Sequence, residues 1–432
     1  MEQPAPAGNA SDGPTSDAEA LNRALVDALL KSGHIRSPRI QEAFRSLFRH
    51  HFLPDLPLET VYRDEAIMTR VEGNIPLSSS SQPAMMAIML EQLDLQPGER
   101  VLEIGTATGY NAAIMAHLVG PSGQVVSVDI DPELVDEAKR NLALAGAVNV
   151  SALAADGGFG YTDMAPYDAI VLTVGSWDIA PAWIEQLAPN GRLLLPLALF
   201  NDYQESILFR RENDHLVSGS HYCCSFVRLR GAFAGPEGRT VEIEPGLKLL
   251  LEHDDLRPFE PATVRAMLDA QRTDIRTGVA LRLRIVHSRL LRALSTRLDN
   301  LCGMVAEGEL ADSGIVPMLF GAPGQSSYST GLIEDRSLAL LLGDPAGGGS
   351  AKKVDEPFEM VVRCYGESDR SGRILVEEIR RWETAGRPCE DPSLTIRVYP
   401  RAHPYTAAPG ERVLEKEHTR LVLSWSGDHL PV

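Results

Sequence analysis

The stretch Val101–Tyr110 (VLEIGTATGY) decides the fold, because an apolar strand runs into a Gly-x-Ala-x-Gly turn that opens a helix. Small residues at Gly105, Ala107 and Gly109 predict a backbone that can approach a ligand over the strand's end, where the helix start offers free N–H groups. Alone the turn is a weak signal, since Gly-rich turns also serve dinucleotide folds or simply pack tightly. Its neighbours in the sequence therefore decide its meaning.

Strands and helices alternate after this turn. Strands are expected at 100–104, 124–128, 148–154, 167–173 and 192–196, and helices at 110–119 and from Asp131-Pro132 to Gly146. Crossover connections between such strands align them in parallel, with helices on the faces. The sequence therefore predicts an α/β fold with a doubly wound, mostly parallel sheet.

Acidic residues follow two of these strands. Asp129 ends the second strand, 24 residues beyond the first glycine of the turn, where an acid can hold the hydroxyl pair of a ribose. Asp156-Gly157 follows the third strand, where a carboxylate can accept from an adenine amino group. The middle small residue is Ala107, and a cofactor without a pyrophosphate does not need a glycine there. S-adenosylmethionine therefore fits better than a dinucleotide, and these two acids with Glu103 would surround its positive sulfur.

Composition disfavours several other classes of protein. The chain has 432 residues, and Lys+Arg 41 against Asp+Glu 59 gives a net charge of −18, which is unsuited to nucleic acid. We find no apolar run of about 18 residues for a membrane span and no export signal. The five cysteines contain no C-x-x-C pair, which favours a reduced, cytoplasmic protein. No His/Cys/Asp cluster has ligand spacing, so no metal is expected.

The two ends of the chain differ from this central region. Residues 1–17 lack an apolar period and predict a disordered tail. The alternation stops after Leu197, and a boundary near Gly235 predicts a separate α+β domain over 239–432, with no catalytic motif. Its expected elements are strands at 281–285, 358–364, 394–399 and 420–425, a helix containing Leu375, Ile379 and Trp382, and a flexible loop at 343–350.

Five motifs together carry a family resemblance. They are Ser79-Ser80-Ser81-Gln82-Pro83, Gln96–Gly105 (QPGERVLEIG), Ala155-Asp156-Gly157, Pro166-Tyr167-Asp168 and Leu187–Leu193 (LAPNGRL). As a set they resemble the protein-L-isoaspartate O-methyltransferase family over roughly residues 19–232. The resemblance implies a Rossmann-like, S-adenosylmethionine-dependent catalytic domain over 18–234. Its substrate would be a peptide or protein with an aspartyl-type carboxylate.

The resemblance also assigns residues. Ser81 matches the family's serine between the methyl donor and the acceptor carboxylate, although it can also cap the helix that begins at Pro83. A carboxylate is already ionised at neutral pH, so it needs aiming and a hydrogen bond rather than a general base. The full predicted set is catalytic Ser81; cofactor-binding Glu103, Gly105, Thr106, Ala107, Gly109, Tyr110, Asp129, Ile130, Asp156 and Gly157; and substrate-binding Ser79, Ser80, Val174 and Arg228.

Departures from the family pattern leave the substrate open. Ser79-Ser80 stand where the family has Thr-Ile before its serine, within a run of four serines at 78–81. Arg228 replaces a usual proline, as an acceptor-side cation or as a solvated strand end. With the extra domain, these features resemble an offshoot found in lanthipeptide clusters. That offshoot methylates an aspartate of a cyclised precursor peptide, and the ester then closes to a succinimide that opens to isoaspartate. Repair of isoaspartyl damage and an idle cofactor-binding scaffold are the alternatives.

Overall fold

The computed structural model describes residues 14–73, 75–200, 203–236, 238–252, 255, 257–334, 336–345, 356–387 and 394–426. Most of the expected tail lies outside these ranges. Helix α1 (Pro14–Lys31) includes the remainder, residues 14–17, so these are helical rather than disordered. Asp17 in the first turn favours that helix start, since an acid there offsets the positive end of the helix dipole.

The first sheet has ten strands, in the order β19-β20-β18-β9-β8-β7-β6-β3-β4-β5. Its strands are β3 (Arg100–Ile104), β4 (Gln124–Asp129), β5 (Val150–Ala154), β6 (Tyr167–Leu172), β7 (Leu187–Phe200), β8 (Tyr203–Glu212), β9 (His215–Cys224), β18 (Leu394–Pro400), β19 (Arg412–Glu415) and β20 (Thr419–Trp425). Strands β5, β4, β3, β6 and β7 pair in parallel, as predicted, and the others pair antiparallel.

Two apolar cores lie on opposite faces of this sheet. Val101 and Val125 belong to one core, and their strand neighbours Leu102 and Val126 to the other, because successive side chains of a strand point to opposite faces. The first core is covered by α1, α2 (Pro38–Ser46), α4 (Pro83–Leu93), α5 (Tyr110–Val119) and α6 (Pro132–Leu144), and the second by α7 (Pro181–Gln186). The α/β fold predicted from the sequence is confirmed.

Short elements complete this part of the chain around the sheet. They are η1 (Arg49–Phe52), α3 (Leu58–Val61), the hairpin of β1 (Ile67–Glu72) and β2 (Ile75–Ser80), η2 (Gly157–Phe159) and η3 (Thr162–Met164). Strand β2 ends with Ser78, Ser79 and Ser80, so the hairpin itself carries three of the four serines that precede α4.

A second, antiparallel sheet has the order β10-β11-β13-β15-β16-β17-β12, with β14 paired to β15. Its elements are β10 (Arg239–Glu244), β11 (Leu247–Leu251), α8 (Pro261–Asp269), β12 (Thr273–Leu281), α9 (Leu283–Ile285), η4 (Val286–Leu290), α10 (Leu291–Arg297), β13 (Leu301–Glu307), η5 (Gly308–Leu310), β14 (Phe320–Ala322), β15 (Ser326–Glu334), β16 (Ser337–Pro345), β17 (Phe358–Gly366) and α11 (Arg370–Thr384). Helix α8 packs on one face, and α10 and α11 on the other.

Two local expectations in this region need correction. The predicted strand at 281–285 is wrong beyond Leu281, because residues 283–285 are helical and lead into α10, whose leucines cover the second sheet. Of the predicted loop at 343–350, residues 343–345 continue β16 opposite Phe358–Met360. The rest of that loop lies outside the described residues.

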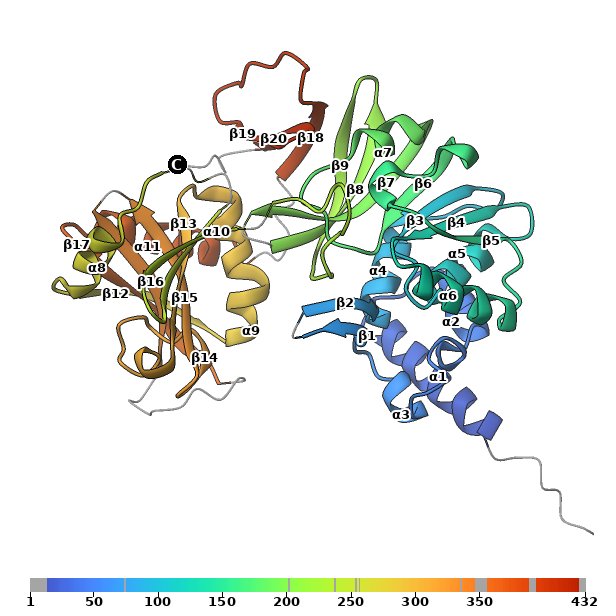
Figure 1. The fold of residues 1–432 in the computed structure, drawn as a ribbon, viewed down its shortest axis with the longest axis horizontal. Helices are drawn as coiled ribbons and strands as arrows, with labels where there is room; N and C mark the ends of the chain where they lie inside the picture. Colours follow the sequence, from blue (N-terminus) through green and yellow to red (C-terminus); the bar gives the residue numbers. More distant parts are fainter. Residues whose placement is uncertain are drawn as a thin grey trace, which may run out of the picture.

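The sheets do not follow the expected boundary of the C-terminal domain. Strands β18, β20 and β19 join the first sheet beside β9, where Figure 1 shows them in red next to the green strands. An antiparallel strand there pairs the edge that β9 would otherwise expose. A buried ion pair also joins the two parts, since Arg292 Nε of α10 lies 2.6 Å from Glu205 Oε1 of β8. Residues 239–432 are therefore not one separate sheet unit.

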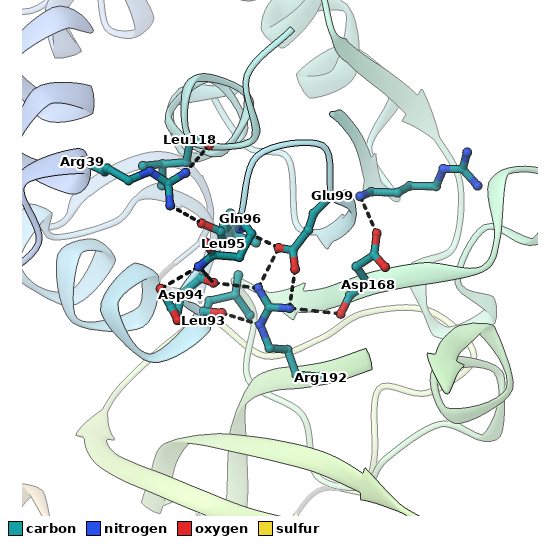
Figure 2. Close-up of polar contacts among 10 residues, drawn as sticks. Arg39, Leu93, Asp94, Leu95, Gln96, Glu99, Leu118, Asp168 and Arg192 are labelled. Atoms are coloured by element: carbon teal, nitrogen blue, oxygen red, sulfur yellow. Dashed lines mark hydrogen bonds and ion pairs between the residues drawn. The ribbon is translucent and has the colours of Figure 1, made fainter. Parts of the chain in front are cut away.

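A polar cluster closes the amino-terminal edge of the parallel strands (Figure 2). The two Nη atoms of Arg192 donate to the carboxylate of Glu99, at 2.9 Å to Oε1 and 2.7 Å to Oε2. It also donates to the backbone carbonyls of Leu93, Asp94 and Asp168. Asp168 in turn accepts from the Arg100 backbone N–H at 2.8 Å, which joins the starts of the paired strands β6 and β3.

Three further properties concern the described residues only. None of their helices combines the length and apolar character needed to cross a membrane. No three of their His, Cys, Asp or Glu side chains group closely enough to hold a metal ion. Their cysteines, 223, 224, 302 and 364, form no disulfide.

Candidate active site

A cleft of about 730 Å³ lies at the carboxyl ends of β3 and β4. It is lined by the predicted residues Ser79, Ser80, Ser81, Gly105, Thr106, Ala107, Tyr110, Asp129, Ile130, Gly157, Val174 and Arg228. Three members of the predicted set, Glu103, Gly109 and Asp156, do not line it. Segments far apart in the sequence thus meet where parallel α/β sheets usually bind ligands.

Asp129 is fixed at the end of β4 by the turn after β3. Its carboxylate accepts from the Ala107 N–H and from the Asp131 N–H, both at 3.1 Å. Ala107 holds a φ of 45°, an uncommon value for a residue with a side chain, and such strain is typical of binding turns. Burial raises the pKa of Asp129, while Arg230 Nη2 lies 4.0 Å from its Oδ1. The carboxylate is therefore aimed, with hydrogen-bonding capacity left for a ligand.

The glycines of the turn serve the chain's own packing. A Cβ on Gly105, whose φ is +106°, would lie 2.5 Å from Thr173 Oγ1. Gly109 has a φ of +87°, and a Cβ there would press on Ala138 and Leu142 of α6. Contacts within the chain alone therefore require glycine at both positions. The close approach of a ligand, which the sequence suggested, is not needed to explain them.

Glu103 lies beneath the turn rather than in the cleft. It is fully buried, accepts from Asn111 Nδ2 at 2.8 Å, and lies 2.6 Å from the Ser127 hydroxyl. Burial raises the pKa of Glu103 to about 7. The Ser127 hydroxyl also lies 2.7 Å from Thr106 Oγ1 in the turn. Glu103 therefore supports the turn from below, because its strand position points inward, and its direct contact with the cofactor stays a prediction.

Asp156 ties the cleft's far side to the segment after β9. One carboxylate oxygen accepts from the Gly158 N–H at 2.9 Å and the other from the Ala232 N–H at 2.8 Å. The neighbouring Phe233 packs edge-on against Phe159, with ring centroids 5.5 Å apart. The contact of Asp156 with an adenine amino group stays a prediction, since both oxygens already hold the backbone.

The four serines divide into two pairs with different surroundings. Ser78 and Ser80 are buried; the Ser78 hydroxyl accepts from Thr69 at 3.0 Å and the Ser80 hydroxyl from Arg49 at 3.3 Å. Among the described residues, the hydroxyls of Ser79 and Ser81 have no hydrogen-bond partner. Side chains alternate along this extended segment, so Ser79 and Ser81 are the stronger candidates for an acceptor contact, and the substrate contact of Ser80, which also lines the cleft, stays a prediction.

Arg49 is a residue that the sequence reasoning missed. Its guanidinium has no exposed surface and donates to the backbone carbonyls of Val61, Ser80 and Ser81, at 2.9, 3.2 and 2.9 Å. It therefore fixes the backbone that presents the two free serines. In the sequence it stands between Phe48 and the His50-His51 pair, where a solvated arginine side chain is the usual interpretation.

Two arginines line the acceptor side of the cleft. Arg228 lies opposite Gly175 in an isolated parallel bridge, and its Nη2 donates to the Pro236 carbonyl at 2.6 Å. Arg230, which was not predicted, lies beside Asp129. Both line the cleft, and two positive charges there favour an anionic acceptor.

The cleft's composition suits the nucleoside of S-adenosylmethionine. Apolar walls from Val128, Ile130 and Leu229 stand beside the aimed carboxylate of Asp129 and the hydroxyl of Thr106. Asp129 would hold the ribose hydroxyls, and the backbone of the turn would face the amino-acid part of the cofactor.

Comparisons with known proteins agree with this chemistry. The family model described as protein-L-isoaspartate(D-aspartate) O-methyltransferase matches residues 20–233. A protein-L-isoaspartate O-methyltransferase of Methanopyrus kandleri is 38% identical over 219 residues, which are 49% of this chain and 93% of that protein. Protein-L-isoaspartate O-methyltransferase 1 of Archaeoglobus fulgidus is 43% identical over 184 residues, 42% of this chain and 81% of that protein. A solved protein-L-isoaspartate O-methyltransferase covers 94% of this chain and 100% of its own, with a TM-score of 0.49 and 24% identity.

The matched residues 20–233 contain the whole cleft, from the serine segment to Arg230. The chain therefore belongs to the protein-L-isoaspartate(D-aspartate) O-methyltransferase family and is a carboxyl O-methyltransferase that uses S-adenosylmethionine.

Proposed function

We propose that the enzyme methylates an aspartyl-type carboxylate within a peptide chain. One observation carries the proposal: among the described residues that line the cleft, the ionisable side chains are Tyr110, Asp129, Arg228 and Arg230. Burial raises the pKa of Tyr110, and the Asp129 carboxylate is engaged by backbone N–H groups. This wall offers no evident general base, and a carboxylate is the acceptor that needs none.

The chain's residues would position the acceptor rather than activate it. S-adenosylmethionine supplies an electrophilic methyl group on a positively charged sulfur. One carboxylate oxygen attacks the methyl carbon, the electron pair of the C–S bond stays on sulfur, and no proton moves. The hydroxyl of Ser81 or Ser79 would hold the other oxygen, and Arg228 would attract the anionic substrate into the cleft.

More specifically, the proposed substrate is a cyclised, ribosomally made precursor peptide. An aspartate is methylated, the next backbone nitrogen displaces methanol to form a succinimide, and hydrolysis gives isoaspartate. The cleft lies within residues 20–233, so it is complete without the second sheet. The presence of that large sheet supports selection of a particular peptide. The names of the relatives support the alternative acceptor, an isoaspartyl residue of a damaged protein.

One assay separates these acceptors. The full chain and S-adenosylmethionine are incubated with an isoaspartyl peptide, a linear aspartyl precursor and its cyclised form, and mass spectrometry follows methyl gain and methanol loss. Methylation of the cyclised precursor supports the finer proposal. Methylation of the isoaspartyl peptide alone replaces it with repair, and methylation of no peptide would favour a scaffold over an enzyme of this specificity.

A further inference from the structure

A second cavity, of about 840 Å³, lies between the two sheets. Tyr203 of the first sheet and Trp177, in the loop after β6, contribute to its lining, and the second sheet contributes Thr240, Leu250, Tyr328 and Thr330. This cavity exists only because the chain carries the second sheet.

The cavity shares a wall with the reaction cleft. Val174 lines the cleft and Trp177 lines the cavity, and three residues span at most about 10 Å of chain. On the other side, Arg228 lines the cleft and donates at 2.6 Å to the carbonyl of Pro236, which lines the cavity. Lining residues of the two spaces thus lie within about 10 Å of each other, a distance that about three extended peptide residues span.

The wall between the two spaces is held in place by the C-terminal turn. Lys416 Nζ lies 4.4 Å from the centre of the Trp177 ring and 3.5 Å from the carbonyls of Ala198 and Leu199. The adjoining Asp178 carboxylate accepts from the His418 N–H at 2.7 Å. The indole is thus a fixed surface rather than a loose side chain, which lowers the entropy lost when a partner packs against it.

The lining combines three aromatic rings with polar groups, Arg239 and Glu252 among them, which suits an aromatic side chain and the peptide backbone around it. Trp177, Tyr203 and Tyr328 supply rings, and Leu250 adds an aliphatic surface. The Thr330 hydroxyl donates to the Tyr328 hydroxyl at 3.1 Å, so polar groups at the floor remain near for a peptide N–H or carbonyl. Tyrosine and tryptophan surfaces of this kind are enriched where proteins bind peptides and other proteins.

We propose that this cavity is a substrate subsite that binds an aromatic side chain of the peptide, two to four residues from the methylated position. The inference rests on the proposed function, since it assumes a peptide acceptor in the neighbouring cleft. Through this subsite the second sheet selects among peptides without touching the reacting atoms.

The test uses the full chain and nine acceptor peptides of nine residues. Each carries the carboxylate acceptor at its centre, in the isoaspartyl or aspartyl form that the enzyme methylates. One peptide has alanine on both flanks, and the others place a single tryptophan at each flanking position. We expect tryptophan at one or two positions to lower KM about tenfold with kcat nearly unchanged, as for a side chain entering a desolvated pocket.

Two variants on one strand give the matched control. Thr240 is exposed and lines the cavity, and Glu242 lies exposed two residues further along β10 outside it. Thr240→Trp should fill the cavity, raise the KM of the best tryptophan peptide to that of the alanine peptide, and leave the alanine peptide unaffected. Glu242→Trp should change neither, and Leu250→Trp provides a second filling variant.

The outcomes are distinguishable from failure of the proposed function. Equal KM values for all nine peptides, or a tryptophan preference that survives in Thr240→Trp and Leu250→Trp, would overturn the subsite alone. Absence of methyl transfer to every peptide, the alanine one included, would overturn the proposed function and the subsite with it.

Discussion

Arginine and carboxylate side chains occur at both edges of the parallel strands, but they serve opposite purposes there. At the amino-terminal edge, Arg192 meets both oxygens of Glu99 and three backbone carbonyls. At the carboxyl-terminal edge, Asp129 is held by two backbone N–H groups and has an arginine only at 4.0 Å. Charges that are fully paired stabilise the fold, whereas charges that are aimed but only partly paired leave capacity for a ligand.

The largest effect should come from removing the arginine of the closed edge. Arg192→Ala leaves Glu99, which is 17% exposed, and three carbonyls without their donor. Breaking such a buried pair typically costs about 3 kcal/mol of stability. Thermal unfolding should show this loss, while the affinity for S-adenosylmethionine of the folded protein stays unchanged.

Arg210→Ala is the control for this change. Arg210 lies directly across from Arg192 on β8 but is exposed, so its removal should alter stability little. Equal destabilisation by both substitutions would mean that the Glu99 cluster has no special role, and a loss of cofactor affinity in Arg192→Ala would erase the contrast between the edges.

At the open edge, a substitution should weaken cofactor binding and leave stability nearly unchanged. Asp129→Ala should weaken S-adenosylmethionine binding by about 2 kcal/mol, roughly thirtyfold, because two ribose hydroxyls lose a charged acceptor. Stability should hardly fall, since the substitution also removes a buried carboxylate whose pKa burial raises. Calorimetric titration measures the affinity, and the exposed Asp136→Ala on α6 is the control. Unchanged affinity would remove Asp129 from the site.

Glu103 is intermediate between these two cases. It is buried at the open edge, and no cationic side chain of the described residues hydrogen-bonds to it. Its pKa of about 7 in the folded chain exceeds the 4.5 of the free side chain, so the folded protein holds the proton more tightly. The contribution of Glu103 to stability therefore falls as pH rises from about 4.5 to 7 and stays low above that range. Glu103→Gln should be more stable than the wild type at pH 8 by roughly 1–2 kcal/mol.

The pH dependence provides the check on that prediction. Urea unfolding of both proteins should show the difference shrinking toward zero as the pH falls to about 4.5. A difference that is independent of pH would mean that Glu103 does not titrate in this range, and that the introduced amide packs better for another reason.

Sequence reasoning reached the parts of the site that local patterns encode. The turn at 105–109 and Asp129 follow strands with strong apolar character, so their positions at one sheet edge could be derived from parallel topology. Arg49 could not be found in this way, because its acceptors are carbonyls of residues 61 to 81 that only the folded chain brings together. Strand β18 was predicted as a strand, but alternation along a strand does not reveal its partner, and β9 lies about 180 residues earlier.

The smallest effect should come from the serines, where the comparison between paired and open groups recurs within one segment. Ser81→Ala should lower kcat about fivefold, the value of one hydrogen bond to the acceptor of about 1 kcal/mol, with cofactor affinity retained. Ser78→Ala is the matched control, since its hydroxyl is already bonded to Thr69. Methyl transfer measured for these two variants and Ser79→Ala assigns the contact. Wild-type turnover in Ser81→Ala with a loss in Ser79→Ala would move the contact to Ser79, and a loss only in Ser78→Ala would show that an open hydroxyl is not what the acceptor requires.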